Sequence, residues 1–304
     1  MVGKVIVFGA LGYIGKHLLK NGPKNIYPVT RNKPADLENE WQEADLLISG
    51  SLDNILSPGD VVINLCYSAK ASIAENILMA ENLKTACTKA GVSKLVHCST
   101  AIVVGENPSL NCDESTECMP STDYERAKYK IEEIFLNMAT DKLAVCILRP
   151  TAVVGAGGQN LRKMLSELNS GDNLKNAIRS SVQGHRSLNL VSVKDIVNAI
   201  LFLANDPVVP SGVYNCSADD DPDNHYDNVE NIIRSLIGKP RKLSLPALPS
   251  IFLNGVLAMT RSGSARVSNR NYSAIKLAST GFKRSISIRM AVEDFVRSEM
   301  GNCL

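Results

Sequence analysis

The stretch Lys4-Val5-Ile6-Val7-Phe8-Gly9-Ala10-Leu11-Gly12-Tyr13-Ile14-Gly15-Lys16-His17-Leu18-Leu19 decides the fold of this chain. Residues 5–8 are a short apolar run, which suits a strand buried on both faces. Three glycines follow at three-residue spacing, and the apolar residues after them fall on one helical face. The stretch therefore predicts a buried strand, a glycine turn and a helix.

Each glycine has a separate reason in such a turn. Gly9 permits the tight turn, Gly12 lets a pyrophosphate approach the backbone, and Gly15 lets the helix pack closely on the strand. The N-terminal end of the helix adds free N–H groups and positive partial charge at the same place. An ordinary glycine-containing turn is the alternative. The βαβ pattern continues downstream, however, and that is the context which a dinucleotide site requires.

The composition narrows the classes of protein. With 304 residues, 44% of them apolar, the chain is long enough for one large α/β domain or one domain with a smaller lobe. A net charge of +2 gives no reason to expect nucleic acid or a membrane as a partner. No apolar run approaches the roughly 18 residues of a membrane span, and no secretion signal is evident, so we expect a cytoplasmic protein. The eight cysteines form no CxxC pair, and we expect them to be reduced and to bind no metal.

The end of the second strand indicates the cofactor. This strand is expected over residues 25–31 and ends at Arg31. A carboxylate at this place would hydrogen-bond the adenosine ribose, whereas an arginine can pair with a 2′-phosphate. Because Arg31 has no acid beside it in the sequence, we expect NADP rather than NAD. A solvated arginine is the alternative.

Further elements follow in the order of a βαβ fold. Strands are expected over 44–48 and 60–65, then a helix over 73–90 and a strand over 95–100. Ser51 and Leu52, which follow the first of these strands, would lie beside the adenine. Leu65 and Cys66, at the end of the second, would lie beside the ribose and pyrophosphate.

A tyrosine and a lysine four residues apart are the candidate acid/base pair. A helix is expected over 123–138, and Tyr124 and Lys128 lie on one of its faces. An ammonium beside a phenol favours the phenolate, so Tyr124 would release its proton more easily and serve an alcohol–ketone interconversion. Such spacing alone is common on solvated helix faces. Together with the glycine turn and the strand-end hydroxyls of Ser99 and Thr100, chance becomes a poor explanation.

These motifs together resemble the extended short-chain dehydrogenase/reductases, the group that includes sugar-nucleotide epimerases, dehydratases and reductases. The residues 9–15 match the family's GxxGxxG turn, and Tyr124 and Lys128 match its YxxxK pair. The segment from Asn76 to Gly105 is similar to the family's helix-plus-strand segment, in which Asn76 would have a supporting role. Residues 148–155 are similar to the strand and loop beside the nicotinamide carboxamide. The resemblance covers almost the whole chain.

The resemblance implies a doubly wound parallel sheet (Rossmann) with a smaller C-terminal substrate lobe. The NAD(P)-binding domain would comprise residues 1–155, with a return segment at about 188–215. The substrate-binding lobe would comprise 156–187 and 216–304.

Within that lobe, the apolar stretch from Leu245 to Met259 is expected to be a helix. Residues 266–269 would form a late strand and Gly281-Phe282 a turn. Two departures from the family concern Val104, where many members have a tyrosine, and Ser51, where many have an aspartate that contacts the adenine amine.

The resemblance also assigns roles to the site residues. Thr100 takes the place of the catalytic serine or threonine, Tyr124 is the general acid/base, and Lys128 lowers the phenol pKa and holds the nicotinamide ribose. Thr100 and Tyr124 would also bind the substrate, and Asn160 and Arg186 would contact its diphosphate; a rim charge is the alternative for Arg186. The implied cofactor-binding residues are Gly9, Leu11, Gly12, Tyr13, Ile14, Gly15, Arg31, Ser51, Leu52, Leu65, Cys66, Tyr124, Lys128 and Pro150.

Several activities remain open from the sequence. We expect NADPH-dependent reduction of a keto sugar nucleotide, because Arg31 favours a cofactor that is exchanged in every turnover. An NAD-dependent epimerase or a dehydratase is the main alternative. Reduction of an apolar ketone, such as a steroid, is another, and so is a non-catalytic NADP-binding sensor. The expected partner is a small molecule, and a homodimer is compatible with the resemblance.

Overall fold

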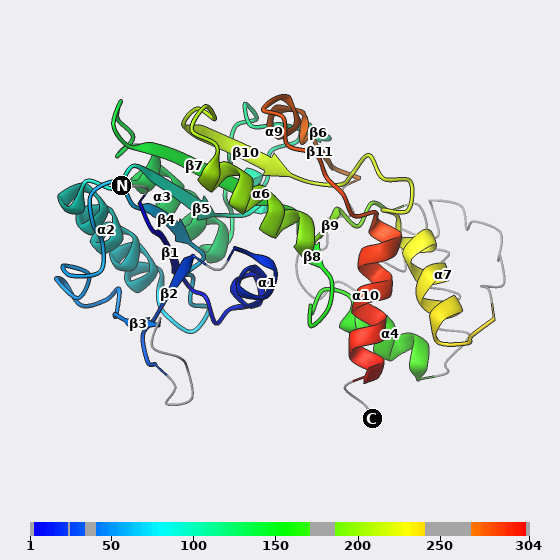
Figure 1. The fold of residues 1–304 in the computed structure, drawn as a ribbon. Helices are drawn as coiled ribbons and strands as arrows, with labels where there is room; N and C mark the ends of the chain where they lie inside the picture. The colour runs from blue at the N-terminus through cyan, green and yellow to red at the C-terminus, as the bar shows by residue number, and fades with distance from the viewer. Residues whose placement is uncertain (1–2, 24, 34–40, 171–185, 241–268, 302–304) are drawn as a thin grey trace.

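The computed structural model describes residues 3–23, 25–33, 41–170, 186–240 and 269–301. Within them lies a seven-stranded sheet in which all neighbouring strands are parallel. The order β10-β7-β5-β4-β1-β2-β3 reverses between β1 and β4 (Figure 1). This order confirms the doubly wound Rossmann fold and places a crevice beyond the carboxyl ends of β1 and β4. The strands are β1 Val5–Phe8, β2 Ile26–Thr30, β3 Gln42–Glu43, β4 Val61–Asn64, β5 Lys94–Cys98, β7 Ala144–Pro150 and β10 Gly212–Cys216.

Helices cover both faces of the sheet, each over its own apolar core. On one face lie α1 (Tyr13–Asn21) and α6 (Val193–Asn205), and on the other α2 (Ile73–Ala90) and α3 (Asp123–Leu136). All four residues of β1 are buried, and its successive side chains enter the two cores alternately. Burial on both faces of the sheet thus explains the continuous apolar run at 5–8, as expected for a central parallel strand.

The helix that carries the candidate acid/base pair has a strong start signal. The Thr122 hydroxyl accepts a hydrogen bond from the Glu125 N–H, and the Glu125 carboxylate accepts one from the Thr122 N–H at 3.1 Å. This reciprocal capping box fixes the first turn of α3. Helix α2 begins with the same kind of capping box and ends at Gly91, whose φ of 69° is the left-handed cap that the sequence predicts.

A third apolar core lies away from the sheet. It is formed by α4 (Arg162–Asn169), α7 (Tyr226–Leu236) and α10 (Ile288–Gly301), against the short strands β8 (Ala152–Val154) and β9 (Leu190–Ser192). These helices gather at the lower right of Figure 1. They make up the smaller lobe of the fold, while the domain limits drawn from the sequence stay a prediction.

The expected strand over 44–48 is wrong. The strand β3 is Gln42–Glu43, and the chain then turns because Asp45 accepts hydrogen bonds from the N–H groups of residues that closely follow it. Its carboxylate accepts the Leu47 N–H at 3.0 Å and its carbonyl oxygen accepts the Ile48 N–H at 3.0 Å. Such local bonds compete with the bonds of a sheet ladder.

The last third of the chain is described in part. A short strand β11 (Asn271–Tyr272) pairs with β6 (Asn111–Cys112), slightly later than the expected strand, whose residues 266–268 lie outside the described residues. The expected helix over 245–259 also lies outside them. Helix α9 (Ile275–Ser279) follows β11. No helix in the described ranges is both long and apolar enough to span a membrane.

Candidate active site

The glycine turn is built as the sequence predicts. Gly9 has a φ of 80°, and a Cβ added there would lie 2.8 Å from the carbonyl carbon of Leu65. A Cβ on Gly15 would lie 2.5 Å from the Gly9 carbonyl oxygen, so this glycine is what brings α1 against β1. Helix α1 starts at Gly12 with no side-chain cap and no acid in its first turn. Its N-terminal end therefore remains available to an anionic group.

A cavity of about 310 Å³ adjoins this turn. Its lining includes Arg31, Leu65 and Cys66, together with Leu11 and two of the motif glycines, Gly9 and Gly12. This is the side of the crevice on which the adenosine half of a dinucleotide is expected.

Ser51 and Leu52 lie outside the described lining of that cavity, and their place beside the adenine stays a prediction. Leu52 is buried in the sheet core, and the Ser51 hydroxyl donates to the Asp45 carbonyl oxygen at 2.6 Å. The turn after β3 instead places Asp45 and Leu46 in the lining. The sequence analysis missed Asp45 and Leu46 as lining residues, because it placed the end of this strand at residue 48 and not at Glu43.

A larger cleft of about 630 Å³ continues from the first cavity. The two share the lining residues Gly9, Gly12, Leu65 and Tyr67, so they form one groove across the carboxyl ends of β1 and β4. The sequence-derived residues that line the larger cleft are Gly9, Gly12, Tyr13, Ile14, Gly15, Leu65, Thr100, Tyr124, Lys128, Pro150 and Asn160.

The three candidate catalytic residues come together from two elements. Thr100 follows β5 and starts the 3₁₀ turn η1 (Ala101–Val104), whereas Tyr124 and Lys128 lie in the first turns of α3. The Lys128 Nζ donates to the Cys98 carbonyl oxygen at 3.1 Å. All three line the larger cleft. The spacing argument from the sequence therefore places a hydroxyl, a phenol and an ammonium at one wall of the groove.

Burial dominates the titration of this pair. It raises the pKa of Tyr124 to about 12, with Cys98 and Tyr67 adding to the effect and a hydrogen bond with the Thr100 hydroxyl opposing it. Burial also lowers the pKa of Lys128 from its usual value. The pKa of the phenol thus moves in the direction opposite to the one expected from the ammonium alone. Both shifts favour the neutral forms of these groups.

Three buried hydroxyls in this cleft have no hydrogen-bond partner among the residues that the structure describes. They belong to Tyr13, Ser99 and Thr151, each of which lines the cleft. A buried polar group without a partner costs free energy, so a polar ligand that bonded these three hydroxyls would relieve that cost. With the glycine cradle, these hydroxyls fit a dinucleotide with its phosphates and carboxamide. Thr151 could have been found in the sequence, since it follows Pro150 in the segment similar to the nicotinamide loop.

A loop from the lobe closes over the start of α1. The His17 Nε2 lies 2.9 Å from the carbonyl oxygen of Ala156 and its ring packs edge-on against Tyr13. Asn160 lines the cleft, with its Nδ2 donating to the Val153 carbonyl oxygen at 2.7 Å. Arg186 does not line it; its backbone oxygen accepts the N–H of Tyr226 at the start of α7.

Asn76 lies on α2 and holds the loop between β4 and α2. Its Oδ1 accepts the Ser68 N–H at 2.9 Å, and its Nδ2 donates to the Ser68 and Ser72 carbonyl oxygens at 3.0 Å each. It therefore fixes a loop at the groove.

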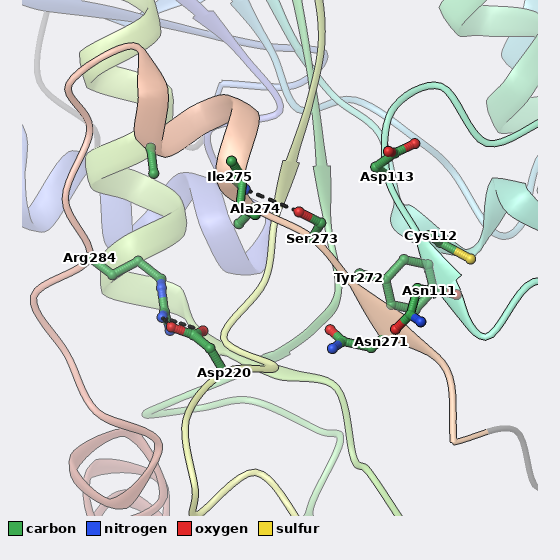
Figure 2. Close-up of a pocket in the computed structure, with 11 residues that line it drawn as sticks. Asn111, Cys112, Asp113, Asp220, Asn271, Tyr272, Ser273, Ala274, Ile275 and Arg284 are labelled. Carbon is green, nitrogen blue, oxygen red and sulfur yellow. Dashed lines mark hydrogen bonds and ion pairs between the residues drawn. The ribbon is translucent and has the colours of Figure 1, made fainter.

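A separate cavity of about 400 Å³ lies between β11, α9 and β6 (Figure 2). It has the Arg284–Asp220 ion pair at one side, and none of its described lining residues also lines the groove. No group of three or more potential metal ligands is found within the described residues.

Comparison with known proteins identifies the class. The fold is the Rossmann-like fold of NAD-binding epimerase/dehydratase proteins. Residues 5–217, well over half of the chain, match the model of the NAD dependent epimerase/dehydratase family. The chain belongs to that family.

The sequence identity between this chain and individual relatives is low. The 3 beta-hydroxysteroid dehydrogenase type 7 of Mus musculus is 31% identical over 181 residues, which are 55% of this chain and 48% of that protein. The chain spans about half the length of the curated relatives it matches. Among solved structures, MoeE5 in complex with UDP-glucose and NAD has a TM-score of 0.70 at 21% identity, covering 99% of this chain and 100% of that one. RMD from Pseudomonas aeruginosa, complexed with NADPH, has a TM-score of 0.71 at 18% identity, covering 99% of each chain. At these identities the likeness shows the fold.

Proposed function

We propose that this chain is an NADPH-dependent oxidoreductase that reduces a keto group of a nucleotide-linked sugar. The observation that carries the proposal is the common cleft: Thr100, Tyr124 and Lys128 line the same groove as the glycine turn. A hydroxyl, a phenol and an ammonium beside a dinucleotide groove are the groups that an alcohol–ketone interconversion uses.

Each residue has a defined part in this reaction. Tyr124 donates its phenolic proton to the carbonyl oxygen, and Thr100 hydrogen-bonds the same oxygen. The nicotinamide, when bound, supplies the hydride chemistry. Lys128 holds the nicotinamide ribose, and a cation beside a phenol favours release of its proton. In the unliganded protein the Thr100 hydrogen bond opposes the effect of burial, and the pKa of Tyr124 stays raised, at about 12.

The choice of NADP rests on Arg31. This exposed arginine lines the cavity of the adenosine half, where it can pair with a 2′-phosphate. An acid, Asp45, lines the same cavity, and its Oδ1 accepts the Leu47 N–H. The solved neighbours hold either NAD or NADPH, so they favour neither cofactor.

The sugar nucleotide is proposed from the fold and from the lobe. MoeE5 carries UDP-glucose on the same fold, and here Asn160 reaches the groove from the lobe side. A neutral ketone, such as a steroid, is the second candidate. Among the described residues that line the larger cleft, Lys128 is the one charged side chain, and a curated relative is a hydroxysteroid dehydrogenase.

The proposal is tested with purified protein, NADPH and a panel of keto sugar nucleotides and steroid ketones. Stoichiometric loss of NADPH absorbance with the sugar nucleotides supports the proposal, and loss with steroid ketones alone supports the second candidate. Tightly retained NAD with sugar interconversion and no net consumption would mean an epimerase. Cofactor binding with no turnover of any substrate would mean a sensor.

A further inference from the structure

Tyr67 touches both members of the acid/base pair, although no motif in the sequence marks it. Its ring meets the Tyr124 ring edge-to-face, with centroids 5.0 Å apart and planes at 88°. The Lys128 Nζ lies 4.9 Å from the centroid of the same ring. Tyr67 also lines both cavities of the groove and therefore lies at their junction.

Two buried asparagines hold the backbone on either side of Tyr67. The Asn64 Oδ1 accepts the Cys66 N–H at 3.0 Å, and the Asn76 Oδ1 accepts the Ser68 N–H at 2.9 Å. Asn64 and Asn76 are 3% and 2% exposed, so these bonds form away from water. The ring of Tyr67 is therefore presented from a fixed loop.

Lys128 is a buried cation with little else to compensate its charge. It is 5% exposed, and it donates a hydrogen bond to the Cys98 carbonyl oxygen. Glu132, one helical turn away, is already bound by the Arg149 guanidinium through bonds of 2.6 and 3.1 Å. Among the described residues Lys128 makes no ion pair of its own. Because an uncompensated buried charge is costly, the face of the Tyr67 ring matters here more than it would at the surface.

The other titratable groups near the pair do not replace this contact. Burial raises the pKa of the thiol of Cys66 to about 12 and that of Cys98 to about 11, so both are neutral at ordinary pH. Burial and the Lys128 charge hold the pKa of His97 well below its usual value, so its ring is neutral as well. The groups that face the pair or Tyr67 are Cys66, His97, Cys98, Asp123 and Glu132.

We propose that Tyr67 is a positioning residue of the reaction: its ring stabilises Lys128 as a buried cation and fixes the orientation of the Tyr124 ring. This inference rests on the proposed function. It assigns to Tyr67 an aromatic face, and the hydroxyl of Tyr67 has no part in it. The alternative is that the ring only fills space at the junction of the two cavities.

Lysine titration by NMR separates the two accounts without any substrate. The full-length protein is labelled with ¹³C at lysine Cε, and the Lys128 signal is identified by its absence in Lys128→Arg. In Tyr67→Phe, which keeps the ring, the pKa of Lys128 should match that of the wild type. In Tyr67→Leu, which keeps an apolar side chain and loses the ring, it should fall by about one unit, the scale of a desolvated cation–π contact. Tyr27→Leu is the matched control, since Tyr27 faces Lys4 at the same 4.9 Å and lies outside the lining of the groove.

A series of fluorinated phenylalanines at position 67 covers the case in which Tyr67→Leu does not fold. Fluorine weakens the ring face step by step with little change in shape, so the pKa of Lys128 should fall with each added fluorine. If the pKa of Lys128 is the same across this series, or is the same in Tyr67→Phe and Tyr67→Leu, the proposal is overturned.

Turnover is the second readout. With an accepted substrate, Tyr67→Leu should lower kcat about 5–30-fold, and Tyr67→Phe should restore it. If the protein turns over no carbonyl substrate, the proposed function is wrong, and the lysine titration still tests the role of Tyr67. Equal losses of kcat in Tyr67→Phe and Tyr67→Leu would contradict the positioning role.

Discussion

The ammonium of Lys128 is bonded to the carbonyl oxygen of Cys98 at 3.1 Å. This bond joins α3 to the end of β5, just before Ser99 and Thr100. Tyr124 lies one helical turn before Lys128, and its phenol is hydrogen-bonded with the hydroxyl of Thr100, which follows the strand. A contact between helix and strand thereby assembles the site from two segments that are distant in the sequence.

Replacing Tyr124 by phenylalanine should lower turnover roughly 10²–10⁴-fold, because the reaction loses its general acid/base. Cofactor affinity should stay nearly unchanged, since the ring remains. Steady-state rates and a fluorescence titration with NADPH measure the two effects. Tyr129→Phe, on the same helix but outside the lining of the cleft, is the control and should keep its rate. Wild-type rates in Tyr124→Phe would remove the catalytic assignment.

Arg31→Ala should narrow the preference for NADPH over NADH by about 1–3 kcal/mol, the scale of hydrogen bonds to a charged group. Affinity for NADH should change little, since that cofactor has no 2′-phosphate. Lys20→Ala removes another exposed cation outside both cavities and should leave the preference as it is. A wild-type protein that binds NADH more tightly than NADPH would contradict this account.

Asp45→Ala should weaken binding of NADPH and NADH alike by about 1–3 kcal/mol, because the carboxylate lines the cavity expected to take the adenine. Calorimetric titration of both cofactors measures this effect. Asp53→Ala is the matched control: this acid pairs with Lys89 at the surface and lies outside the lining. If the two variants bind the cofactors equally well, Asp45 has no contact with them.

Glu132→Gln should destabilise the protein by about 3–5 kcal/mol. The side chains of Glu132 and Arg149 are 1% and 5% exposed, so the change leaves a buried guanidinium without its counter-charge. Its neighbour Glu133 pairs with Lys130 at the surface, and Glu133→Gln should cost less than about 1 kcal/mol. Urea unfolding of both variants makes the comparison. Similar losses in the two would show that Arg149 finds another partner.

Features set by local signals were predictable from the sequence. The glycine turn, the bounds of α2 and the start of α3 depend on glycine conformation and on capping side chains a few residues away. The Tyr-Lys pair followed from helical spacing for the same reason. These signals were enough to place Tyr124 and Lys128 in their helix, whereas Thr100, expected at the end of the strand over 95–100, follows β5 and caps η1.

Features that depend on competing local hydrogen bonds, or on contacts between segments distant in the sequence, could not be predicted from the sequence. Strand β3 ends at Glu43, and Asp45 then accepts the N–H groups of Leu47 and Ile48, which the apolar pattern of residues 44–48 did not reveal. For Arg186 the sequence left a substrate contact and a rim charge open; the structure places it outside the described cleft lining, with its carbonyl oxygen at the start of α7, and its role stays a prediction. Tyr67 carries no motif at all, and its importance appears only when β4 and α3 are brought together.

The central claim is that hydride moves between a nicotinamide and a carbonyl carbon in this groove. The most direct measurement is a single turnover with NADPH deuterated at C4, followed by mass spectrometry of the substrate panel. The account predicts deuterium on the former carbonyl carbon of a keto sugar nucleotide with the wild-type protein, and little or none with Tyr124→Phe. Tight NADPH binding without deuterium transfer to any member of the panel would contradict it.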